Sequence, residues 1–169
     1  MRYLISLLIL ASWTTAVCAG QVAFTKGPVF TDYGPVADVN VTMEIPADAV
    51  FKHSFDVSSP APGGGPNRTL VSAARFINMH ARAGVAEDNI HLAIIVHGKA
   101  VHDVADATSA SASLVAALIK NGTRIIVCGQ SAAYYDVATD DLLPGVEMAI
   151  SAMTAHALLQ QDGYTLNPF

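Results

Sequence analysis

Apolar residues follow two different spacings along this chain of 169 residues. Two short and continuous apolar runs lie at 92–96 and 125–127. Runs of this length that are rich in Ile and Val are typical of strands buried on both faces, as in a parallel sheet covered by helices. At 70–81 and 113–120 the apolar positions have helical spacing instead, which predicts an amphipathic helix in each range.

A glycine ends each predicted helix, and a strand follows it. This order of helix, glycine and strand occurs three times, at Gly84, Gly122 and Gly163. The other predicted elements are strands at 52–57, 146–150 and 164–166 and helices within 131–141 and at 154–161. Alternation of this kind predicts an α/β domain of three layers, with a mostly parallel sheet of about five strands flanked by helices.

The first nineteen residues have the pattern of a secretory signal peptide. Arg2 supplies a positive start, an apolar run follows that is too short to span a membrane, and small residues precede a cut after Ala19. Two alternatives are a buried N-terminal helix and a lipid-modified N-terminus at Cys18. With the signal peptide removed, we expect a periplasmic or secreted protein.

Residues 20–50 are predicted to form an extended N-terminal segment, because glycine, proline and small residues dominate its first half. Apolar and polar residues alternate at 39–45, which predicts one half-buried strand there. The α/β domain is expected to occupy residues 51–169.

The composition of the chain indicates which kinds of binding partner to expect. The chain is 52% hydrophobic and 14% charged, which indicates a globular domain, and its net charge is -5. It has no basic run, so nucleic-acid binding lacks its electrostatic signature. No second apolar run is long enough for a membrane helix, so no span is expected in the mature protein.

Cys128 is the sequence's clearest candidate for chemistry. It ends the apolar run at 125–127, and once Cys18 is removed it is the only cysteine, so an internal disulfide is excluded. A small buried cysteine is often inert packing, whereas a thiol at a strand end that precedes a helix can be a reactive thiolate. The residue pattern alone leaves both interpretations open.

Other polar residues are expected beside Cys128, because ligands of such sheets bind at the carboxyl ends of the strands. His97 ends the run at 92–96 and should face the same edge, although a histidine satisfied by backbone groups is the alternative. The predicted pocket residues are His97, Gly98, Gly129, Gln130 and Ser131.

No cofactor is predicted, and no metal site. His97 and His102 lie near Asp103 and Asp106, but their spacing is not that of a known ligand set. The glycines at 63–65 lack the lysine of a phosphate-binding loop and indicate a flexible loop.

Several short motifs occur together in one order. They are Phe55-Asp56-Val57, Asn78, Val96-His97-Gly98, Val127-Cys128-Gly129-Gln130-Ser131, Asp141-Leu142-Leu143-Pro144-Gly145-Val146 and Leu159-Gln160-Gln161-Asp162-Gly163-Tyr164. In this order they resemble the DsrE/DsrF-like superfamily of sulfur-relay proteins, in its exported single-domain branch. The resemblance covers about residues 50–169.

This resemblance implies a function as well as a fold. Its relay members carry a persulfide on the cysteine that Cys128 matches, and they assemble into trimers or hexamers. The expected function is therefore that of a periplasmic sulfur carrier or sulfurtransferase, and its partners would be sulfur donor and acceptor proteins or small thiols. The alternative is a non-enzymatic module that binds a small ligand or supports assembly, in which Cys128 is structural.

Overall fold

The computed structural model describes residues 20–167, and its centre is a five-stranded parallel sheet in the order β4-β3-β2-β1-β5. The strands are β1 (Phe51–Val57), β2 (Ile90–Val96), β3 (Arg124–Cys128), β4 (Glu147–Ala149) and β5 (Thr165–Leu166). The α-helices are α1 (Arg68–Arg82), α2 (Ala112–Lys120), α3 (Gly129–Tyr134) and α4 (Ala152–Gln161). Short 3-10 helices lie at Gln21–Ala23, Glu87–Asn89, Gly98–Val104 and Thr139–Asp141. The predicted fold class is confirmed.

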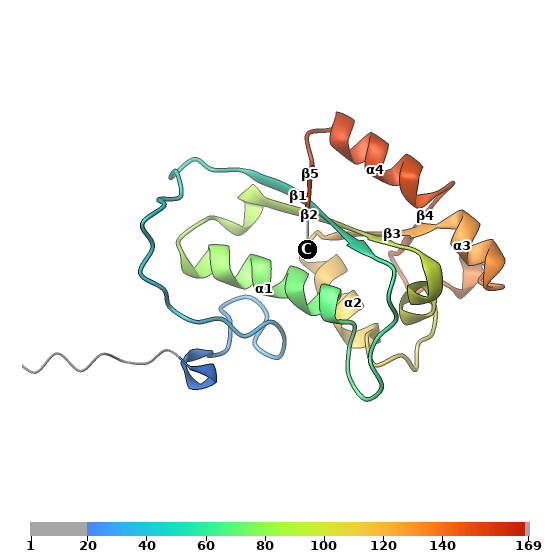
Figure 1. Cartoon of the computed structure of the whole chain (residues 1–169), viewed down its shortest axis with the longest axis horizontal. Helices are drawn as coiled ribbons and strands as arrows, with labels where there is room; N and C mark the ends of the chain where they lie inside the picture. Colours follow the sequence, from blue (N-terminus) through green and yellow to red (C-terminus); the bar gives the residue numbers. More distant parts are fainter. Residues whose placement is uncertain (1–19, 168–169) are drawn as a thin grey trace, which may run out of the picture.

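Helices cover both faces of the sheet, so the domain has three layers (Figure 1). α1 and α2 pack on one face, where they bury the larger core. α4 lies on the other face, where Ala155 and Leu159 pack against Ile95 and Ile126. β2 and β3 are therefore buried on both faces, which explains why their sequences are continuously apolar.

Two capping side chains fix where helices begin. Asn67 accepts a hydrogen bond from the backbone N–H of Thr69 and starts α1, while Ser151 accepts one from Thr154 and starts α4. The helix predicted at 154–161 has a different start, because Thr154 is the third residue of α4. α4 therefore starts two residues earlier than predicted, and its first turn lies at the carboxyl end of β3.

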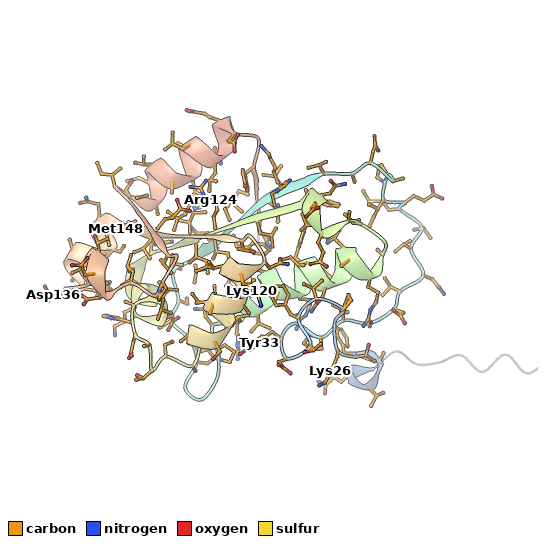
Figure 2. The ribbon with its side chains drawn as sticks, turned by 180° about the vertical axis from the view of Figure 1, so that it is seen from behind. Lys26, Tyr33, Lys120, Arg124, Asp136 and Met148 are labelled. Atoms are coloured by element: carbon orange, nitrogen blue, oxygen red, sulfur yellow. The ribbon has the colours of Figure 1, made fainter. Side chains whose placement is uncertain are left out.

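The N-terminal segment lies against α1, on the same side of the sheet as the larger core. Figure 2 shows Lys26 and Tyr33 on that side and Arg124 and Met148 on β3 and β4. Asn78 of α1 is fully buried and holds the segment through five hydrogen bonds between 2.9 and 3.1 Å. Its side-chain oxygen accepts from the backbone N–H groups of Val29 and Phe30, and its amide nitrogen donates to three backbone carbonyls.

The strand predicted at 39–45 is wrong. The range has no strand structure, and its apolar side chains Val39, Val41 and Met43 are mostly exposed. The sheet edge beside β1 is occupied by β5 instead. The signal-peptide prediction falls on residues 1–19, which lie outside the described residues. Within 20–167, no helix is long and apolar enough to cross a membrane.

Candidate functional site

Three polar or reactive side chains emerge on the α4 face of the sheet near the carboxyl ends of its strands. In the sheet register Asp56 pairs with Ile95, which pairs with Ile126. Because side chains alternate along a strand, His97 and Cys128, each two positions further on, point to the same face as Asp56. The parallel sheet therefore brings together one residue from each of three strand ends.

These side chains line a pocket of about 370 Å³ between the sheet and the first turn of α4. Its other lining residues are Gln130, Ser151, Ala152, Met153 and His156. The early start of α4 matters here, because the first helical residues form the opposite wall. Its polar groups are the thiol, the carboxylate, the two imidazoles, the amide of Gln130 and the hydroxyl of Ser151, and its apolar part comes from Ala152 and Met153.

Cys128 is 6% exposed and is the one cysteine among residues 20–167. Burial raises the pKa of its thiol, but hydrogen bonds from the hydroxyl and backbone N–H of Ser131 and from the N–H groups of Ala152 and Gln130 lower that pKa by more. The net pKa lies below the ordinary value of a cysteine. The N–H groups belong to the starts of α3 and α4, so two helix ends point at one sulfur.

Ser131 links the thiol to the neighbouring strand end. Its Oγ accepts a hydrogen bond from the backbone N–H of Gly98 at 3.0 Å, which orients the hydroxyl proton toward the sulfur of Cys128. Gly98 has a φ of +56°, a left-handed conformation that favours glycine. The turn after β2 therefore positions a donor for the thiolate at the end of β3.

Replacing Ser131 with alanine is expected to raise the pKa of Cys128, because the thiolate loses a side-chain donor. The pH dependence of alkylation of Cys128 by iodoacetamide measures this change. The midpoint should move to higher pH, while Ser113→Ala, at an exposed position on α2, should leave it unchanged. An unchanged midpoint in Ser131→Ala would mean that the hydroxyl does not stabilise the thiolate.

Asp56 holds two histidines, one at each carboxylate oxygen. His97 Nε2 lies 2.9 Å from its Oδ2, and His156 Nε2 lies 2.8 Å from its Oδ1. Burial raises the pKa of Asp56, but the hydrogen bonds from His97 and His156 lower it by more, so the net pKa lies below its usual value. An ionised carboxylate only accepts hydrogen bonds, and both imidazoles therefore carry their proton on Nε2.

The residues predicted from the sequence have different positions. His97, Cys128 and Gln130 line the pocket. Ser131 and Gly98 do not line it, but the hydrogen bonds described above connect them to Cys128. Gly129 does not line it. A Cβ at Gly129 would lie 2.8 Å from the backbone oxygen of Ala149, so glycine allows the end of β4 to approach closely.

Sequence reasoning missed Asp56 and His156 as site residues. The position of Asp56 could have been inferred from the sequence. Phe55 and Val57 on either side of it belong to the larger core, and side chains alternate along a strand, so Asp56 must point to the opposite face of the sheet. His156 could not have been placed in this way. It lies 100 residues further along the chain, and only the packing of α4 on the sheet brings it to the carboxylate.

The residues considered for a metal site have other roles. Asp103 is buried and accepts hydrogen bonds from the side chain of Asn67 and the backbone N–H of Ala61, both at 2.8 Å. His102 packs edge-on against Tyr135. No group of three or more His, Cys, Asp or Glu side chains suited to holding a metal ion occurs in the described part of the chain.

Fold and site together define a parallel α/β protein with a cysteine thiol of lowered pKa at the carboxyl edge of its sheet. The DsrE/DsrF-like family matches residues 52–168, and the chain belongs to this family. A comparison of the sequence with curated proteins finds no match.

Two solved structures are similar to the fold. The first is a protein of unknown function, MTH1491 from Methanobacterium thermoautotrophicum, with a TM-score of 0.57 and 18% identity over 69% of this chain and 97% of its own. The second is the ychN protein from E. coli, with a TM-score of 0.51 and 14% identity over 69% of this chain and 100% of its own. At these identities the likeness concerns the fold alone.

Proposed function

We propose that this protein is a sulfur carrier that holds sulfane sulfur as a persulfide on Cys128. Membership of a sulfur-relay family supports the class of chemistry. The observation that carries the proposal is the thiol itself: Cys128 lines a pocket, and donors from two helix starts lower its pKa. A thiolate is the nucleophile in sulfur exchange, so this site favours the reactive form.

The carrier cycle has two exchange steps. In the first, the Cys128 thiolate attacks the sulfane sulfur of a donor, a new S–S bond forms at Sγ, and the donor's own S–S bond breaks with its electron pair on the departing group. In the second, an acceptor thiolate attacks the outer sulfur of the persulfide, and Cys128 leaves as a thiolate. The cycle moves one sulfur atom and needs no external oxidant or reductant.

Intact-mass spectrometry after exposure to polysulfide tests the proposal. The protein should gain the mass of one sulfur atom, peptide mapping should place it on Cys128, and a reducing thiol should remove it. Mapping also separates Cys128 from Cys18, the second cysteine of the sequence. A thiol that reacts with iodoacetamide but never takes up sulfur would contradict the proposal.

The carrier is also proposed to work outside the cytoplasm, because the pattern of residues 1–19 is that of a signal peptide. Expression of the full chain in a bacterium with two membranes should release a periplasmic protein whose N-terminal residue is Gly20, as read by N-terminal sequencing. Recovery of an uncut protein in the cytoplasmic fraction would contradict export.

We further propose a homo-oligomer, a trimer or hexamer, as the resemblance to sulfur-relay proteins implies. Several large apolar side chains of α3, of α4 and of the connection between β4 and α4 are exposed in the single chain: Tyr134, Ile150, Met153 and Leu158. Light scattering coupled to size-exclusion chromatography would give the mass in solution, and a monomeric mass would exclude the assembly.

A further inference from the structure

The carboxylate-bridged histidine pair, formed by Asp56, His97 and His156, belongs to the same pocket as the thiol but does not bind the sulfur. The donors to Cys128 come from Ser131, Gln130 and Ala152 instead. The three residues lie on separate elements: Asp56 on β1, His97 at the end of β2 and His156 on α4. The residues that stabilise the thiolate are therefore different from the residue that holds the imidazoles. The two histidines make no hydrogen bond to the sulfur and can interact with a molecule bound in the pocket.

The two rings have different surroundings. His156 is 17% exposed, and its Nδ1 is buried without a hydrogen-bond partner among the described residues. Its one hydrogen bond among the described residues is therefore the bond from Nε2 to Asp56. His97 is 32% exposed. His156 is therefore suited to act as a fixed hydrogen-bond donor that orients Asp56. His97 is suited to exchange a proton with a bound molecule through its Nδ1.

The charge of the lining restricts the donor. None of the described residues that line the pocket is Lys or Arg, whereas Asp56 contributes a carboxylate. A dianion such as thiosulfate would be brought beside that carboxylate and the thiolate with no permanent cation to balance it. A small organic persulfide carries at most one negative charge on its sulfur and reacts as neutral R–S–SH, so it meets less of this repulsion, and Ala152 and Met153 offer an apolar wall for its carbon part.

The two donors also differ in their departing groups. Thiosulfate releases sulfite, which departs as an anion. An organic persulfide releases a thiolate, whose parent thiol has a pKa of about 8.5, so a proton supplied during departure speeds the step. An imidazole is the side chain best suited to deliver that proton near neutral pH.

We propose that His97, positioned by Asp56 and His156, transfers the proton when a small organic persulfide loads sulfur onto Cys128. The proton that the Cys128 thiol loses on ionisation goes to solvent, and His97, which is partly exposed, takes up a proton from solvent. Sγ then bonds to the outer sulfur of R–S–SH, the donor's S–S bond breaks with its electron pair on the carrier sulfur, and the proton passes from His97 to that sulfur. Cys–SH and R–S–SH become Cys–S–SH and R–SH, so atoms and electrons balance. The inference rests on the proposed sulfur-carrier function.

The test compares the loading rate of Cys128 from cysteine persulfide and from thiosulfate in the full chain, across pH, by mass spectrometry. His97→Gln should slow loading from cysteine persulfide by about 100-fold and flatten its pH profile, as expected for loss of an acid–base group. Asp56→Asn and His156→Gln should slow it less. His91→Gln, a matched change at an exposed histidine on β2, should have no effect.

Rescue separates a proton-transfer role from a structural one. Imidazole in the buffer should restore part of the loading rate of His97→Ala, and circular dichroism should confirm that this variant is folded. An unchanged rate and pH profile in His97→Gln, or no rescue of a folded His97→Ala, would overturn the proton-transfer role. Faster loading of the wild type from thiosulfate would overturn the donor class. Failure of Cys128 to load from either donor would instead contradict the carrier function itself.

Discussion

Cys128→Ser is expected to lose sulfur loading completely and to keep the fold. Serine lacks the polarisable, readily ionised sulfur that attacks a sulfane donor, while its hydroxyl can still accept the hydrogen bonds that Ser131 and the helix starts give to Cys128. The free energy of unfolding should therefore change by about 1 kcal/mol or less. Urea unfolding measures the stability, and intact-mass spectrometry measures the loading.

The same variant separates the carrier from a module in which Cys128 only packs. A packing role predicts that Cys128→Ser and Cys128→Ala disturb stability and leave the protein's sulfur uptake as it was. Cys18→Ser is the matched control, because it removes the other cysteine of the sequence and should leave loading unchanged. Sulfur uptake that survives in Cys128→Ser and maps to another residue would exclude Cys128 as the carrier.

Asn78→Leu is expected to cause the largest loss of stability among the substitutions considered. Leucine has a similar size, but it leaves two backbone N–H groups and three carbonyls of the N-terminal segment without their side-chain partner. A buried polar group without a partner costs about 1–3 kcal/mol. The total is limited because the segment can detach and expose these groups to water, so the free energy of unfolding should fall by about 3 kcal/mol.

Two measurements check this prediction. Urea unfolding gives the loss of free energy, and limited proteolysis should cut residues 20–36 faster in Asn78→Leu than in the wild type. Asn40→Leu, at an exposed position of the same N-terminal region, is the control and should change neither. Wild-type stability in Asn78→Leu would show that the segment docks without this side chain.

The parallel sheet could be predicted because burial on both faces leaves a compositional signal. Ile90–Val96 and Arg124–Cys128 are read correctly for this reason. The alternation at 39–45 led to a wrong prediction, because alternating apolar residues form a strand only where a partner strand is available. Here β5 occupies the sheet edge beside β1. Local pattern alone cannot decide which segment pairs with an edge strand.

Only the site residues that lie at the ends of strands could be predicted from the sequence. Cys128 and His97 end neighbouring parallel strands, so their common edge follows from the order of elements. Asp56 became interpretable once the register placed it on the face under α4. His156 depends on how α4 packs across the sheet, a contact between residues 100 positions apart that no local spacing encodes.

The most direct test follows an isotopically labelled sulfur atom through one cycle. Labelled donor is mixed with the full chain, excess donor is removed, and a small acceptor thiol is added while peptides and thiols are monitored by mass spectrometry. The label should appear first on the peptide containing Cys128 and then, with the same time course as its loss from that peptide, on the acceptor. Label that reaches the acceptor without passing through Cys128, or that stays permanently on Cys128, would contradict a sulfur carrier.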